Sequence, residues 1–155
     1  MKTIYLSLLI CSLGIASCSR NSDDAQPTPT KPEVTKSNFK TYHPCGVAVS
    51  STGKVAISTY EGDTADGQIF IWNSFADFNA DKTADYQYQV KDPEAVAFDA
   101  NNNLFIANTY ESKIHFTKDV SKAPTDFFYI GNGAASPTNP RGMSFDSKGR
   151  LYVMC

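Results

Sequence analysis

The feature that most constrains this chain is a short phrase, a proline followed by small and apolar residues, that occurs three times at a nearly constant interval. The copies begin at Pro44, Pro93 and Pro140, so the prolines lie 49 and then 47 residues apart. A period between about 20 and 50 residues is typical of repeat architectures, in which each unit buries its apolar face against a neighbour. We therefore expect a tandem array of similar modules.

Each copy continues as a β-hairpin, with a short apolar strand, a polar turn and a second strand. Gly53, Asn102 and Gly149 share one register in the three turns. Gly and Asn best tolerate the positive φ of a tight hairpin. The second strands alternate with the period of two that is typical of half-buried strands. They are predicted at residues 55–58, 104–107 and 151–154.

Further strands follow the hairpins in the first two units. Third strands are predicted at residues 68–72 and 113–116, and more polar fourth strands at 85–90 and 126–130, with no sustained helical period anywhere. Trp72 is expected to pack between neighbouring modules. Four antiparallel strands per unit make a propeller blade, so the sequence predicts an all-β fold, a partial β-propeller of about two and a half four-stranded blades. The blades are expected at residues 44–92, 93–139 and, in part, 140–155.

The sequence pattern of these units resembles that of the NHL-repeat family of β-propellers and of the related gluconolactonase/regucalcin-like group. Family blades read roughly Pro-x-Gly-Val-Ala-Val-Asp, a turn with Gly, an apolar pair, an Asp or Asn, and an Ile-x-Val-Phe strand. The second unit follows this pattern from Pro93 to Phe116, and the resemblance covers residues 39–155. One departure is that the second strand ends in Thr59, Asn108 and Cys155 rather than in a repeated Asp. The resemblance implies the fold and leaves the activity open.

The start of the chain has the pattern of an export signal over residues 1–17. Lys2 is followed by an apolar run over residues 4–15, which is too short to cross a bilayer and matches a signal core. Small residues then precede Cys18, which resembles the lipobox of bacterial lipoproteins and implies acylation of the Cys18 thiol. The alternative is an ordinary secretory signal cut near Ala16.

Residues 18–38 are predicted to form a flexible linker, because three prolines stand among Thr, Lys and Asp with few apolar residues. Ser19 follows the lipidated cysteine, and the pair Asp23-Asp24 resembles the export tag of surface lipoproteins in Bacteroidetes-like bacteria. The resemblance implies a lipid anchor at the outer membrane of the cell envelope. Whether the propeller segment, residues 39–155, faces the periplasm or the cell surface stays open.

The number of blades leaves three alternatives, because a closed propeller needs about four to eight. The chain is expected to be the front part of a longer protein, interrupted by a stop codon or an incomplete gene. Alternatively, several copies assemble, so that three chains supply six or more blades and complete a six-bladed-like propeller as a homo-oligomer. The third alternative is a self-sufficient curved sheet. An uncovered strand at residues 151–154 would be an apolar edge.

Composition narrows the classes of partner. The chain carries a formal net charge of −2 and no block of Lys and Arg, so nucleic acid is not an expected partner. Of the four cysteines, Cys11 leaves with the signal and Cys18 is the expected lipid site. Cys45 and Cys155 remain, but their repeat positions differ, so a disulfide between them is not expected.

Propeller ligands generally bind where the loops that open the innermost strands meet. In family members the residue between Pro and Gly lies there; here it is Cys45, Glu94 or Arg141. The loops after the second strands should reach the same face. A ring of Tyr and Glu with one Arg suits a protein or glycan ligand, because Tyr offers an apolar ring with a polar tip. The expected ligand face comprises His43, Tyr60, Glu61, Glu94, Asn108, Tyr110, Glu111 and Arg141. Alternatively, these tyrosines only cover blade edges and Glu61 and Glu111 are solvated.

The function expected first is a binding or scaffolding lipoprotein with no catalytic residues and no cofactor. The rival is a fragment of a metal-dependent lactonase or related hydrolase. The gluconolactonase resemblance implies a Ca²⁺ or Zn²⁺ ion held by Glu, Asn and Asp from several blades. Glu94 and Asn108 suit that chemistry, but the remaining ligands would lie outside these units, so no metal site is assigned. A truncated product without function is the third possibility.

Overall fold

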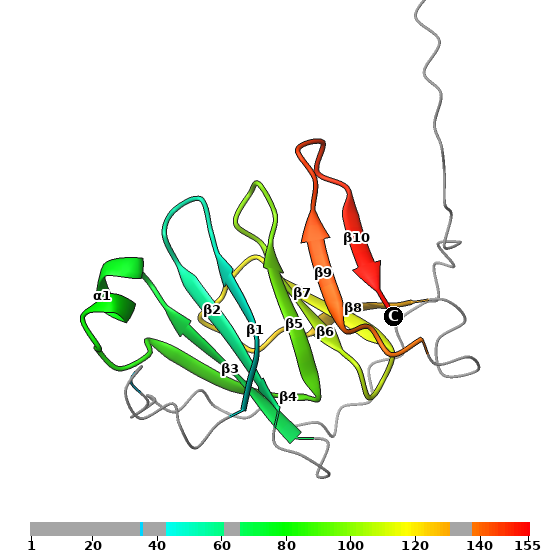
Figure 1. The fold of residues 1–155 in the computed structure, drawn as a ribbon, viewed down its shortest axis with the longest axis horizontal. Helices are drawn as coiled ribbons and strands as arrows, with labels where there is room; N and C mark the ends of the chain where they lie inside the picture. Colours follow the sequence, from blue (N-terminus) through cyan, green and yellow to red (C-terminus); the bar gives the residue numbers. More distant parts are fainter. Residues whose placement is uncertain (1–34, 36–42, 61–65, 131–137) are drawn as a thin grey trace, which may run out of the picture.

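The structure is a computed structural model that describes residues 35, 43–60, 66–130 and 138–155. The predicted export signal, the lipid site Cys18, nearly all of the linker and Glu61 lie outside the described residues. Three antiparallel sheets stand side by side (Figure 1), two with four strands and one with two.

Each four-stranded sheet is a simple meander in which sequential strands are neighbours. The first sheet has the order β1-β2-β3-β4 and the second the order β5-β6-β7-β8. Their strands are β1 His43–Val49, β2 Val55–Tyr60, β3 Asp66–Trp72, β4 Tyr86–Lys91, β5 Pro93–Phe98, β6 Leu104–Asn108, β7 Lys113–Thr117 and β8 Asp126–Tyr129. The third sheet pairs β9, Gly142–Phe145, with β10, Leu151–Met154. We call these sheets blades 1, 2 and 3. Among the described residues, the all-β prediction and its two and a half blades are confirmed.

The three hairpin turns have the conformation that the repeat predicts. Gly53, Asn102 and Gly149 all have positive φ, at 86°, 63° and 75°. In blade 2 the Asp99 carboxylate accepts hydrogen bonds from the backbone N–H groups of Asn101 and Asn103, at 2.9 and 2.8 Å. An aspartate that binds its own turn in this way favours the hairpin over other local structures. The repeated polar residues therefore fix the turns.

The apolar core lies between blades, as a repeat architecture requires. One cluster joins Ala56, Ile69 and Tyr88 of blade 1 to Leu104 and Ile106 of blade 2. A second cluster joins blade 2 to blade 3; its members include Ala107, Ile114, Met143, Leu151 and Val153. Blade 2 thus presents one face to blade 1 and the other face to blade 3.

Trp72 corrects one expectation, because it does not pack between the two blades. Its side chain is buried with Val55, Ile57 and Phe70 on the face of blade 1 that points away from blade 2. The Phe78 ring meets it edge-on, with the ring centroids 5.1 Å apart. Phe78 belongs to α1, Phe75–Asn79, a short helix that the sequence did not predict.

Ser74 begins α1 by accepting a hydrogen bond from the Asp77 N–H at 3.0 Å, as a helix N-cap does. The helix has five residues. Across the described ranges, no helix combines the length and apolar character needed to cross a membrane.

Candidate functional site

The starts of the innermost strands β1, β5 and β9 lie along one edge of the array, at the lower side of the view in Figure 1. The ends of β2, β6 and β10 lie at the same edge, because each pairs antiparallel with an innermost strand. We call this edge the loop face. The residues around each proline phrase lie along this edge.

A β-bulge sits at the proline phrase in both complete blades. The register skips from Pro44 to Gly46 in β1 and from Pro93 to Ala95 in β5. Cys45 and Glu94 therefore have no partner opposite them in the ladder. A bulge locally re-aims a side chain, and these two bulges place Cys45 and Glu94, each directly after its proline, at the loop face. In blade 3 the Arg141 N–H donates to the Met154 carbonyl at 2.8 Å, directly before β9.

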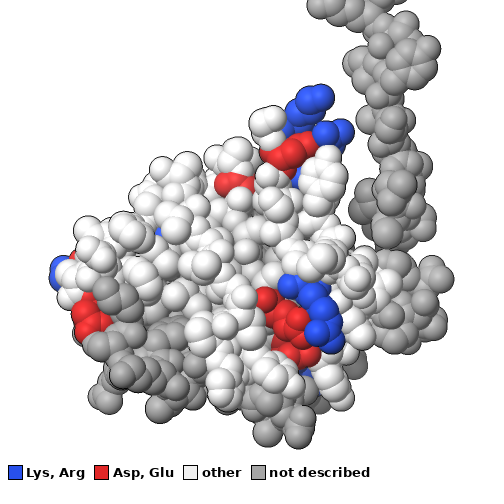
Figure 2. Space-filling view, viewed as in Figure 1, with Lys and Arg blue, Asp and Glu red and all other residues white. Residues whose placement is uncertain are grey.

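Three charged side chains meet on the loop face between blades 2 and 3. The Arg141 Nη1 atom lies 3.6 Å from the Glu94 Oε1 atom. Partial burial raises the pKa of Glu94, while Arg141 opposes this rise and Asp92 adds to it. Burial likewise raises the pKa of Asp92, again opposed by Arg141. Figure 2 shows acidic and basic side chains gathered in one group, right of centre in the lower half of the same view.

Asp92 is a member of this group that the expected ligand face lacked. Its backbone has a positive φ of 42°, although a residue before proline is normally extended. Within the described part of the chain, its Oδ1 atom is buried and has no hydrogen-bond partner. Asn139, at the same place before Pro140, has a similar φ of 46°. The sequence offered one signal for Asp92: it stands directly before a repeat proline, as the predicted site residue His43 does.

His43 and Cys45 form the blade 1 part of the loop face. The His43 Nδ1 atom lies 3.2 Å from the Tyr60 carbonyl oxygen, which brings these two predicted residues together. The Cys45 thiol donates to the His43 carbonyl at 3.3 Å. Burial, followed by the nearby Glu94 carboxylate, raises the pKa of Cys45. Cys45 and Cys155 are both exposed free thiols.

Asn108 is buried, and both polar atoms of its side-chain amide form hydrogen bonds with Glu111 in the turn after β6. The Glu111 N–H donates to Asn108 Oδ1 at 2.9 Å, which fixes the orientation of the amide. Asn108 Nδ2 then donates to Glu111 Oε2 at 2.8 Å and lies 3.2 Å from His115 Nε2. Asn108 and Glu111, both predicted for the ligand face, thus meet in a local network.

The other side chains of this network are basic and aromatic. Lys113 Nζ lies 3.3 Å from Glu111 Oε2 and 4.3 Å from the centre of the Phe127 ring. Lys91 Nζ lies 3.9 Å from Glu111 Oε1 and 5.6 Å from the centre of the exposed Tyr110 ring. A cation over an aromatic face is attracted by the ring quadrupole. Lys91 and Lys113 were not predicted for the site.

The neutral form of His115 is favoured by its surroundings. Because Nε2 faces the donor amide of Asn108, the ring proton of the neutral form lies on Nδ1. That atom is buried without a hydrogen-bond partner in the described part of the chain. Burial lowers the pKa of His115 below its usual value, while the Glu111 carboxylate opposes the shift.

Tyr60 and Tyr110, each of which stands between a Thr and a Glu in the sequence, are not equivalent in space. Pro44 pairs with Thr59, whereas Pro93 pairs with Asn108, so Tyr110 lies one residue further from its paired strand position than Tyr60 does. Tyr60 is therefore a half-buried strand residue, while Tyr110 is exposed in a turn.

The implied metal chemistry fits these residues poorly. Among the described residues, no three His, Cys, Asp or Glu side chains converge on a point that could hold a metal ion. Both polar atoms of the Asn108 amide are engaged in the network around Glu111.

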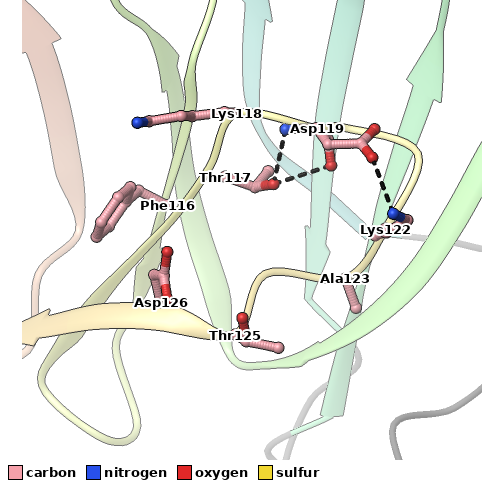
Figure 3. A pocket seen from close by; sticks show the side chains of 8 residues that line it. All are labelled: Phe116, Thr117, Lys118, Asp119, Lys122, Ala123, Thr125 and Asp126. Atoms are coloured by element: carbon pink, nitrogen blue, oxygen red, sulfur yellow. Dashed lines mark hydrogen bonds and ion pairs between the residues drawn. The ribbon is translucent and has the colours of Figure 1, made fainter.

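A hollow of about 340 Å³ lies where β7 turns into β8, at the opposite edge from the loop face (Figure 3). Thr117 Oγ1 donates to the Asp119 carbonyl at 2.8 Å, and Lys122 Nζ lies 3.4 Å from Asp119 Oδ2. These groups interact with one another and hold the connection between β7 and β8 in place. None of the predicted site residues lines this hollow.

No protein-family model and no curated protein matches the chain. A catalytically inactive variant of virginiamycin B lyase from Staphylococcus aureus, solved with quinupristin, is similar with a TM-score of 0.52 and 14% identity. It matches over 78% of this chain and 37% of the lyase chain. A protein from Lactobacillus plantarum is similar with a TM-score of 0.50 and 19% identity, over 72% of this chain and 34% of its own.

The fold is that of a partial β-propeller. The chain spans little more than a third of the length of either similar structure. At these identities the likeness establishes the propeller fold alone.

Proposed function

We propose that the loop face is a binding surface for a protein partner, displayed by an NHL-repeat-like lipoprotein at the outer membrane. One observation carries the binding role. Glu94 occupies a bulge that takes no part in the ladder, yet it stands partly buried beside Asp92 and Arg141. Charges that are partly removed from water cost free energy in the folded chain. A partner with complementary charges would therefore form favourable ion pairs with them.

The mixture of charges favours a protein partner over a glycan. On the loop face, Glu94 lies beside Arg141 and Asp92, and Glu111 lies beside Lys91, so both signs of charge are present. Interfaces between proteins match such patterns with opposite charges, which gives specificity and speeds association. A neutral glycan would instead need an open aromatic platform, and the Tyr110 ring already lies beneath the Lys91 ammonium.

A photo-crosslinker tests this proposal. We would place benzoylphenylalanine at Tyr110 in the full chain and irradiate intact cell envelopes. A protein adduct of defined mass is expected. Exchanging the charges, Glu94→Arg with Arg141→Glu, preserves the ion pair and should abolish the adduct, whereas Lys148→Glu on the distant hairpin turn should leave it. If adducts contain only carbohydrate, the glycan alternative holds; identical adducts in all variants would refute the site.

The lipid anchor has a separate test. Cys18→Ser should stop incorporation of labelled fatty acid and release the chain from the outer-membrane fraction. Cys11→Ser is the matched control and should change neither. Fatty acid retained in the Cys18→Ser variant would contradict the anchor while leaving the binding proposal untouched.

The hydrolase alternative rests on the partly buried carboxyl of Glu94, whose raised pKa suits a group that handles protons. Lactone hydrolysis would be measured with and without Ca²⁺ or Zn²⁺. Metal-dependent turnover abolished by Glu94→Gln would establish an enzyme in place of a pure binding protein.

A further inference from the structure

The turn after β6, residues 109–112, depends on the side chain of Asn108 for support. The backbone bond across the turn, from the Ser112 N–H to the Thr109 carbonyl, is long at 3.4 Å, and Ser112 has a positive φ of 54°. Such a backbone conformation persists only where neighbouring groups hold it. Asn108 supplies this hold, because Oδ1 accepts from the Glu111 N–H at 2.9 Å and Nδ2 donates to the Glu111 carboxylate at 2.8 Å.

The orientation of the Asn108 amide determines which form of His115 fits beside it. A backbone N–H cannot accept a hydrogen bond, so the atom that faces the Glu111 N–H must be the amide oxygen. The amide nitrogen therefore directs a hydrogen at His115 Nε2, which lies 3.2 Å away. Only a neutral ring, with its proton on Nδ1, can accept that hydrogen bond.

We infer that His115 is an acid-sensitive switch for the turn at residues 109–112. Protonation adds a hydrogen to Nε2, so that two donors, Nε2 and the Asn108 amide nitrogen, would face each other across 3.2 Å. Turning the amide over does not remove the conflict, because its nitrogen would then meet the Glu111 N–H. The protonated ring and the ordered turn therefore exclude each other, and by linkage acid favours the released turn.

The groups around the imidazole ring support this competition. Burial lowers the pKa of His115, the Glu111 carboxylate opposes the shift, and Lys113 adds to it. A protonated ring would compete with Asn108 and Lys113 for Glu111 Oε2, which lies 2.8 and 3.3 Å from them. On β4, Tyr88 stays uncharged because burial raises its pKa. The other groups on neighbouring elements are Lys91 of β4, close to Glu111, and the Phe127 and Tyr129 rings of β8.

The turn also holds the charged group on the loop face. Its first residue, Thr109, is buried and donates two hydrogen bonds, from its N–H to the Asp92 carbonyl at 3.0 Å and from Oγ1 to the Pro140 carbonyl at 2.6 Å. Asp92 belongs to the charged group, and Pro140 directly precedes Arg141. Release of the turn would loosen the support of both. If the loop face binds a protein partner, as proposed above, acid should weaken that binding.

NMR spectroscopy of the full chain tests the switch without any partner. We would follow the His115 ring and the backbone amides of Tyr110 and Glu111 from about pH 8 to about pH 5. The amides should shift with the same midpoint as the ring, and their protection against hydrogen exchange should fall below it. His115→Gln should abolish both changes. His43→Gln is the matched control, because it removes the other histidine of the chain, and it should leave both changes in place.

A charge-conserving exchange, Asn108→Asp with Glu111→Gln, provides a second test. The acceptor for the backbone N–H of position 111 is kept, but a carboxylate oxygen now faces His115 Nε2 and can accept from the protonated ring. The midpoint of the ring should therefore move above the ordinary histidine pKa of about 6.5. The amides of the turn should stay protected on both sides of that midpoint.

Each outcome decides the inference. Turn amides that stay protected while the His115 ring of the unaltered chain titrates would overturn it. So would an acid release that persists in His115→Gln, or one that persists in the charge-conserving exchange.

The proposed binding role is judged separately, by the Tyr110 crosslink at both ends of the pH range. Loss of the adduct in acid from the unaltered chain, but not from His115→Gln, would show that the switch controls binding. Equal yields at both pH values, or equal losses in both chains, would contradict that control. Absence of an adduct at every pH would refute the binding role, while the amide titration still decides the switch.

Discussion

Gly67 lies where the seam between blades 1 and 2 leaves no room for a side chain. A Cβ there would collide with the Thr59 backbone and the Pro93 ring. The proline that opens blade 2 thus packs directly against the backbone of blade 1. The same residue that marks the repeat in the sequence also sets how closely two blades approach.

Gly67→Ala should lower the free energy of unfolding by about 3 kcal/mol or more, because the backbone must shift to relieve overpacking. Gly53→Ala is the comparison, since a Cβ there meets nothing and only the positive φ of 86° is unfavourable; a loss of about 1 kcal/mol is expected. Urea denaturation measures both. Equal losses would show that the seam accommodates a methyl group.

His115 should make stability depend on pH. Its pKa is lowered on folding, chiefly by burial, so the folded state binds a proton less tightly than the unfolded state. The corresponding stability is present above the ordinary histidine pKa of about 6.5 and is lost as pH falls through the lowered pKa.

The measurement is urea denaturation on both sides of the ordinary pKa, with His115→Gln as the non-titrating comparison. The unaltered chain should lose more stability on acidification than the variant. Parallel losses would show that the acid sensitivity arises from other groups.

At the scale of elements, the hairpin turns also link neighbouring blades. Asn102, in the turn of blade 2, accepts a hydrogen bond from the Ser51 hydroxyl of blade 1 at 2.8 Å and one from the Thr52 N–H at 3.3 Å. Asn102, whose φ is positive, therefore has a second role, because it holds the turns of blades 1 and 2 together.

Substitutions at Asn102 should separate these two roles. Asn102→Gly keeps the turn conformation and removes the link, which should cost about 1 kcal/mol of stability. Asn102→Ala removes the link and adds the strain of a positive φ, for a further loss of about 1 kcal/mol. Thermal or urea unfolding orders the variants; equal stability of Gly and Ala would indicate that the turn relaxes.

The strands were predictable because they repeat. The hairpins and third strands lie at the expected residues, and β10 has the predicted bounds, since alternation and turn residues are local signals. α1 was not predictable, because five residues cannot show a helical period and Trp72 packing supports it. The loop face followed from the proline phrase, but Asp92, Lys91 and Lys113 join it through the bulge and through contacts between strands. Those contacts require the tertiary structure.

At the scale of the whole molecule, the seams between blades carry most of the apolar core. One cluster joins blade 1 to blade 2, and another joins blade 2 to blade 3. The described blades therefore depend on their neighbours for stability, as repeat units do.

The bulges at positions 45 and 94 have a consequence for how such a scaffold diversifies. Since the ladder skips these residues, selection can exchange their side chains while the hydrogen bonds on either side persist. A combinatorial library randomised at Cys45 and Glu94 would consequently sample new recognition chemistry at little risk to folding. Tandem duplication would multiply such interchangeable positions, one for every added copy.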